Sequence, residues 1–76
     1  MTDLTKIELK ESFHRAVATK DEDATTKLIA QGADVSSYLP DPRSEEAVYG
    51  ALRQQGTLGI EGAARQAAKI IIRVNP

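Results

Sequence analysis

The feature that most constrains the fold is an alanine-rich apolar stripe in the last part of the chain. Its side chains recur at helical spacing, as Ile60, Ala63, Ala64, Ala67, Ala68, Ile71 and Ile72. The protein has one Phe, two Tyr and no Trp, so its core must be built from aliphatic side chains and alanine. Such small side chains suit helices whose axes lie close together. The stripe therefore predicts an all-α domain.

Length and composition limit this domain to a single small unit. A chain of 76 residues can bury one hydrophobic core, and the net free energy of folding from such a core is small. The absence of cysteine excludes disulfide bonds, thiolate metal sites and thiol catalysis. We therefore expect residues 1–76 to form one helical domain that gains stability from a partner. Its acidic start, without an apolar leader, predicts a cytoplasmic protein with no membrane association.

The N-terminal half predicts a helical hairpin. The run Thr5-Lys6-Ile7-Glu8 fits a capping box, which would begin a helix over 5–19. Asp21 is suited to cap a second helix over 22–31. Gly32 would end that helix, because glycine enters the left-handed conformation without a steric cost. The short connection makes the two helices an antiparallel αα-hairpin.

The C-terminal half predicts a second hairpin after an extended loop over 34–42. Asp41 is the expected cap of a third helix, Pro42 its first residue, and Gly56 lies just past its predicted end near Gln55. A tight connector over 57–59 then leads into a fourth helix. Its β-branched end, Ile70 to Val74, is also compatible with a short strand. The expected architecture is therefore four short helices arranged as two αα-hairpins.

The segment from Phe13 to Val35 also follows a known pattern. Its matching residues are His14, Ala16, Leu28, Ile29 and the run Gly32-Ala33-Asp34-Val35. With these residues the segment resembles the body of an ankyrin repeat, in which Leu-His-x-Ala opens the first helix and Gly-Ala-Asp-Val follows the second. The resemblance implies that His14 has a structural role, holding a turn between repeats by hydrogen bonds.

The match departs from the family in two places and covers under a third of the chain. Glu11-Ser12 replaces the Thr-Pro turn, and Lys20 replaces the glycine that bends the chain between the two helices. The residues after Val35 do not repeat the pattern, although stacked repeats need about three copies. An unrelated αα-hairpin with the same local chemistry therefore remains the alternative to kinship.

No set of residues in the sequence predicts catalysis. Glu11 and His14 could form an acid–base pair, but the pattern supplies no nucleophile beside them. The acidic run over 21–23 lacks the spacing of a calcium loop, and the glycine-rich run over 56–62 lacks the ending of a phosphate loop. We expect no enzyme activity, no cofactor and no metal.

The sequence offers three candidate surfaces for a partner. Arg65, Lys69 and Arg73 recur every four residues and predict a basic ridge, which Arg53 would extend. The second surface is the apolar end of the last helix, with Ile70 and Ile72, and the third is the central loop, with Tyr38.

These surfaces predict a non-catalytic protein–protein interaction module. One version is a small stand-alone regulator or inhibitor that covers a surface of a larger protein. A homodimer through the C-terminal helix is a further alternative. The other function class is a small nucleic-acid-binding protein that uses the basic ridge, although the near balance of 10 Lys and Arg against 11 Asp and Glu does not favour it.

Overall fold

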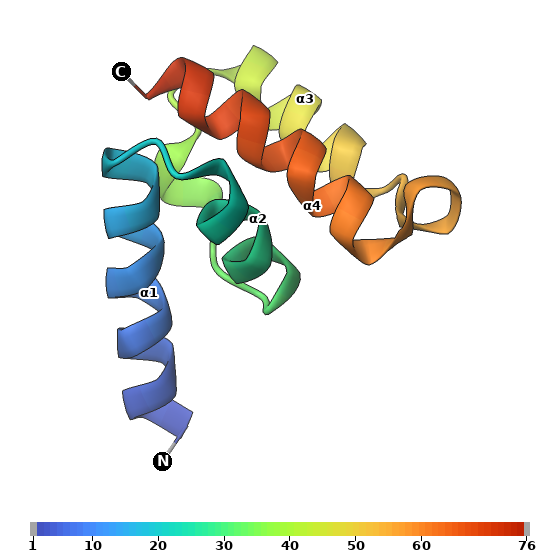
Figure 1. Ribbon diagram of the computed structural model, residues 1–76. Coiled ribbons are helices and arrows are strands. Elements are labelled where there is room, and N and C mark those ends of the chain that lie inside the picture. Colours follow the sequence, from blue (N-terminus) through green and yellow to red (C-terminus); the bar gives the residue numbers. More distant parts are fainter. Residues whose placement is uncertain (1, 76) are drawn as a thin grey trace.

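The computed structural model describes the backbone of residues 2–75 and the side chains of residues 7–75. It contains the helices α1 (Thr2–Ala18), α2 (Glu22–Ala30), α3 (Pro42–Leu52) and α4 (Gln55–Val74), and one short 3-10 turn, η1 (Ser36–Tyr38) (Figure 1). The predicted all-α class is confirmed, and none of residues 2–75 forms a strand. The segment from Ile70 to Val74 is the last turn of α4.

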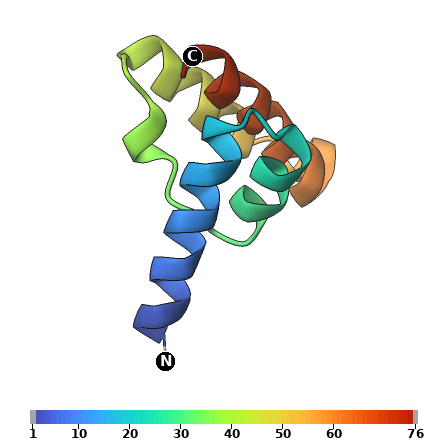
Figure 2. The same ribbon diagram turned by 60° about the vertical axis from the view of Figure 1, so that its left-hand side comes forward.

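The helices form two antiparallel pairs that are joined along α2. α1 packs against α2 and α3 packs against α4, as the two predicted hairpins require. α2 packs almost as extensively against α4, so that α2 lies between α1 and α4 (Figure 1). α1 barely contacts α4, and its N-terminal half extends away from the other helices (Figures 1 and 2). One side of α1 is therefore left without a neighbouring helix.

The core has the aliphatic and alanine-rich composition that the sequence predicts. Ala63, Ala64, Ala67 and Ala68 are at most 1 % exposed, and α3 and α2 lie against the stripe that they form. The larger core side chains around this stripe are Phe13, Val17, Ile29, Val35, Val48 and Ile71. Phe13 is 1 % exposed and is the one phenylalanine, so a single aromatic ring anchors α1 to the core.

The start of α1 differs from the prediction. The helix begins at Thr2, so Thr5 lies inside it and is not its cap. The Thr5 side chain itself lies outside the described side chains. A helix needs no particular side-chain cap to begin, because water can satisfy its first amides. The cap of α2 is confirmed, since Asp21 accepts a hydrogen bond from the Ala24 amide at 3.1 Å.

Both helices of the first hairpin end in the same way. After α2, Gly32 has φ +101°, its amide donates to the Ile29 carbonyl, and the next amide donates to the Leu28 carbonyl. This is a Schellman motif, and it confirms the structural role predicted for Gly32. After α1, Lys20 takes the same place with φ +58°. Lys20 is the residue that replaces the glycine of the ankyrin pattern, so here a lysine makes the left-handed turn.

The second hairpin begins as predicted and turns earlier than predicted. Asp41 accepts a hydrogen bond from the Ser44 amide at 2.7 Å, and Pro42 is the first residue of α3. α3 ends at Leu52, and Gly56 lies in the first turn of α4 rather than at a break between helices. The backbone is instead non-helical at Gly59, with φ 79° and ψ 166°. Only glycine adopts this combination readily, so Gly59 sets the bend.

Candidate protein-binding surfaces

Arg65 does not contribute a free charge to the predicted basic ridge. Its Nη1 lies 2.9 Å from the Glu22 Oε2 and 3.0 Å from the Asp23 Oδ1, both at the start of α2. Hydrogen bonds that Arg65 donates to Asp23 and Glu22 raise the pKa of Arg65 above its usual value. Because α2 packs against α4, the acidic first turn of α2 faces this part of α4. The acidic run over 21–23 and Arg65 are far apart in the sequence, and the packing of α2 against α4 brings them together.

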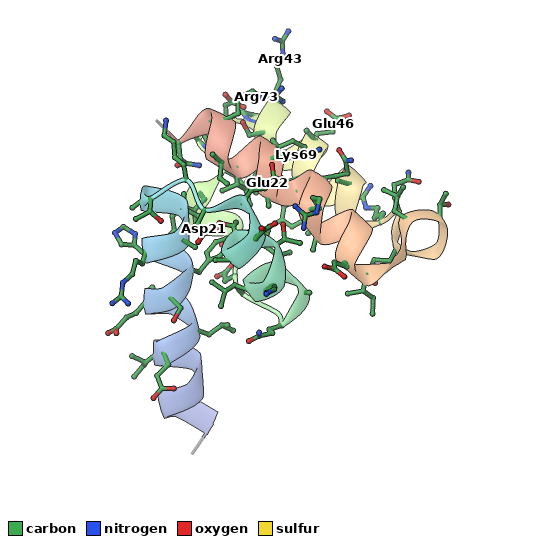
Figure 3. The ribbon with its side chains drawn as sticks, in the orientation of Figure 1. Asp21, Glu22, Arg43, Glu46, Lys69 and Arg73 are labelled. Carbon is green, nitrogen blue, oxygen red and sulfur yellow. The ribbon has the colours of Figure 1, made fainter. Side chains whose placement is uncertain are left out.

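The remaining basic residues lie at different ends of the α3–α4 pair. Lys69 and Arg73 are exposed near the end of α4, and Arg43 is exposed at the start of α3 at the same end of the molecule (Figure 3). Arg53 caps the far end of α3. Glu46 also lies on α3 between Arg43 and the helix centre, so the surface near Lys69 carries both signs of charge (Figure 3). The four predicted basic residues therefore do not form one continuous ridge.

The apolar end of α4 is largely used inside the domain. Ile71 is fully buried, Ile70 packs against the core, and Ile72 is partly buried. Asn75 ties this end to η1, because its Nδ2 donates to the carbonyls of Tyr38 and Ile71, each at 2.8 Å. Ile70 and Ile72 thus face mostly their own chain.

Tyr38 joins η1 to α1. Its ring lies edge-on to Phe13, with the ring centroids 5.0 Å apart and the planes at 89°. Its hydroxyl shares a hydrogen bond of 3.0 Å with His14 Nδ1. Burial raises the pKa of Tyr38 above its ordinary value, since the charged phenolate loses hydration there. His14 therefore has a structural hydrogen bond, and its partner in this structure is a tyrosine side chain.

A groove lies beside this aromatic pair. It has a volume of about 360 Å³ and an apolar floor made by Leu9, Phe13, Ala33 and Tyr38. Lys10 and Asp34 line it with opposite charges, and Gly32 and Ser37 complete the wall. Hydrogen bonds from the backbone and hydroxyl of Ser36 lower the pKa of Asp34, and the charge of Lys10 lowers it further.

The groove exists because α1 is longer than α2. α1 has 17 residues and α2 has 9, so the apolar stripe of α1 continues past the end of its partner. Leu9, one turn before Phe13, is left partly exposed there. Of the residues that line the groove, Tyr38 was predicted from the sequence as a partner-binding residue, whereas Leu9, Lys10 and Ala33 were not. The unequal helix lengths were the signal that could have located them.

Large apolar side chains are exposed in three other places. Ile7 is 54 % exposed on the projecting half of α1. Leu58 and Ile60 are 45 % and 60 % exposed on either side of the Gly59 bend, and Tyr49 is 37 % exposed on α3. These positions are far apart along the chain, and Ile7 adjoins further exposed residues of α1.

Among the described side chains of residues 7–75, no three His, Asp or Glu side chains are gathered closely enough to hold a metal ion. None of the described helices is long and apolar enough to cross a membrane. Comparison of the chain with protein-family models, curated proteins and solved structures finds no match.

Proposed function

We propose that this protein is a non-catalytic protein-interaction module whose binding surface is the groove between α1 and η1. The observation that carries this proposal is the groove itself, an apolar floor with a charged residue of each sign at its edge. Protein interfaces are commonly anchored by one large side chain that fills such a pocket, with polar contacts around it. Phe13 and Tyr38 supply the floor, and Lys10 and Asp34 supply the polar contacts.

The floor is rigid enough to serve as a preformed pocket. Phe13 is buried in the core, and Tyr38 is fixed by the ring contact, by the His14 hydrogen bond and by Asn75 at its carbonyl. A pocket that does not reorganise avoids part of the entropy cost of binding. This favours recognition of a defined side chain over loose apolar contact.

The size of the protein suits a regulator or inhibitor that covers part of a larger protein. A standard interface buries about 800 Å² on each partner, which is about 15 % of the 5209 Å² surface of this domain. The domain can therefore use the groove and its surroundings in one interface while the rest stays in solvent. In this version of the proposal, binding blocks a surface of the larger protein and no chemical step takes place.

Nucleic-acid binding is less well supported than protein binding. The groove is apolar with balanced charges, and Arg65 is already paired with two carboxylates. Phosphate recognition needs several free cations along one surface. The basic residues near the end of α4 are accompanied by Glu46.

The proposal is tested by capture and by blocking the groove. Tagged protein is used to capture partners from a lysate with and without nuclease, and each captured protein is then purified and its affinity measured. Ser37→Arg places a long charged side chain at the groove, and Ser12→Arg makes the same change at an exposed position of α1 outside it.

We expect binding that survives nuclease, that Ser37→Arg weakens at least tenfold, and that Ser12→Arg leaves unchanged. A partner that is lost with nuclease, or an affinity that both variants change equally, contradicts the proposal. Loss with nuclease together with a steep fall in affinity as salt rises would instead identify a nucleic-acid-binding protein.

A further inference from the structure

The face of α1 that points away from the core has a regular pattern. The buried residues of α1 are Phe13, Ala16 and Val17. On the opposite side, Ile7, Glu11, His14 and Ala18 are all exposed and line one shallow surface. Their spacings of four, three and four residues are those of the seam in a helical coiled coil. No other α-helix packs against this face (Figures 1 and 2), and Lys10, Arg15 and Tyr38 of η1 line the same shallow surface beside it.

The order of these side chains along α1 makes the face complementary to the same face of a second copy that runs antiparallel to it. When two such helices run in opposite directions with a two-fold axis between positions 11 and 14, Ile7 of one lies against Ala18 of the other. Glu11 of one then lies against His14 of the other. Each pair of facing side chains is complementary. Two apolar side chains are in contact at each end of the pairing, and a carboxylate lies against an imidazole in each central pair. Two-fold symmetry makes every such contact twice.

The charges beside the seam follow the same symmetry. Glu8 and Arg15 are exposed and flank the seam on one side. In the antiparallel pairing Glu8 of one helix approaches Arg15 of the other, and the pair occurs twice. Within one chain these two residues are seven positions apart, about 10 Å along the helix. Their opposite charges can therefore meet only between two copies.

The hydrogen bond of His14 prepares it for such a contact. The Tyr38 hydroxyl lies 3.0 Å from Nδ1. When this hydroxyl donates to Nδ1, the proton of a neutral imidazole is on Nε2. Nε2 is then a donor on an exposed side chain, where a carboxylate is a stronger acceptor than water. Glu11 of a second copy supplies that acceptor in the antiparallel pairing.

We propose that two copies of this protein associate through this outer face of α1, in an antiparallel pair held by the Ile7–Ala18, Glu11–His14 and Glu8–Arg15 contacts between copies. The projecting half of each α1 lies along the other copy in this arrangement. Four layers from one helix form a small interface compared with about 800 Å² per partner in a standard complex. We expect a reversible dimer with a Kd in the micromolar range or weaker.

The test is a charge exchange followed by sedimentation velocity over a concentration series. Wild type is expected to rise from the mass of one chain, 8.2 kDa, toward twice that mass. Glu8→Arg alone and Arg15→Glu alone each create a repulsive pair and are expected to weaken the Kd about tenfold or more. The double variant with both changes restores opposite charges and is expected to return to within about threefold of wild type.

The controls separate this interface from other effects. Glu46→Arg makes the same charge reversal at an exposed position of α3 and is expected to leave the Kd unchanged. Far-UV circular dichroism checks that each variant folds, which we expect because positions 8 and 15 are exposed. Ile7→Asp removes the apolar end contact without changing either charge and should also weaken the dimer.

Each of the following results would overturn the proposal. These are a wild type that stays at the mass of one chain at about millimolar concentration, a double variant that does not recover, and a Kd that Glu46→Arg weakens as much as the seam variants do. A dimer that responds only to changes at Lys69 and Ile72 would place the contact on α4 and would also contradict it.

This inference rests on the proposed interaction function, and the two can fail separately. Ser37→Arg blocks the groove and lies outside the seam, so it should abolish partner capture and leave the dimer intact. Glu8→Arg should weaken the dimer and leave capture by the groove unchanged. If wild type dimerises but captures no partner, the proposed function is refuted and the dimer proposal stands.

Discussion

Replacing Lys20 by glycine should stabilise the domain. Lys20 ends α1 with φ +58°, where its amide donates to the Val17 carbonyl at 3.1 Å and the Asp21 amide donates to the Ala16 carbonyl at 2.9 Å. A residue with a Cβ pays about 1–2 kcal/mol to occupy the left-handed region. Glycine avoids that cost. It also gives the unfolded chain more conformational freedom, which lowers the free energy of unfolding by about 0.4–1 kcal/mol. The expected net gain in the free energy of unfolding is about 0.8 kcal/mol.

The assay compares wild type, Lys20→Gly and Lys20→Ala by urea and thermal unfolding, with circular dichroism as the signal. For a domain of this size, the gain corresponds to a rise in Tm of about 3–6 °C in Lys20→Gly. Lys20→Ala is the control, because it removes the exposed side chain and keeps the Cβ. We expect it to stay within about 0.5 kcal/mol of wild type. A Lys20→Gly protein no more stable than Lys20→Ala would refute the reasoning, since the two differ only in the conformational preference at that position.

Three further predictions concern the core, a helix cap and the bend in α4. Phe13→Ala should lower the free energy of unfolding by about 3–5 kcal/mol, because it removes the one buried phenylalanine of the domain. The total free energy of unfolding expected for a domain of this size is about 4–11 kcal/mol. Urea unfolding measures the loss, and a loss below about 1 kcal/mol would contradict the packing described. Hydrogen bonds from Ser44 lower the pKa of Asp41, so its contribution to stability is present above an unfolded-state pKa near 3.9 and is lost as pH falls through the lower folded value. Asp41→Asn keeps the cap and should flatten the acid side of the stability profile, whereas an unchanged profile would show that other carboxylates dominate it. Gly59→Ala should lower the free energy of unfolding by about 1–3 kcal/mol. The whole effect should come from backbone strain at the positive φ of Gly59, because no atom lies within 4 Å of the added Cβ. Thermal unfolding measures it, and an unchanged Tm would show that the bend relaxes freely.

Local sequence signals predicted most of the secondary structure. Asp21 and Asp41 cap the helices that they were expected to cap, and Gly32 ends α2. These features depend on hydrogen bonds within a few residues, so the local sequence is sufficient to specify them. The errors fall where two local signals compete. Gly56 and Gly59 both suit a turn; Gly56 lies inside the first turn of α4, and the bend falls at Gly59, the last residue of the connector predicted over 57–59.

The candidate surfaces were harder to predict because they depend on which helices meet. Arg65 looks like part of a basic ridge until α2 brings Glu22 and Asp23 to it. Tyr38 was predicted to contact a partner, but its contacts with Phe13 and His14 join segments that are 25 and 24 positions apart. No spacing rule along one helix connects such residues.

The all-α class, the four α-helices, the caps of α2 and α3 and the alanine stripe at the centre of the core follow from the sequence alone. Each follows from periodicity or from hydrogen bonds between near neighbours. Only the tertiary structure decided that α2 lies between α1 and α4, that one side of α1 has no neighbouring helix, and that a groove opens beside Tyr38. Helix packing is set by side chains distant in sequence, whose contacts become favourable only when the whole core closes.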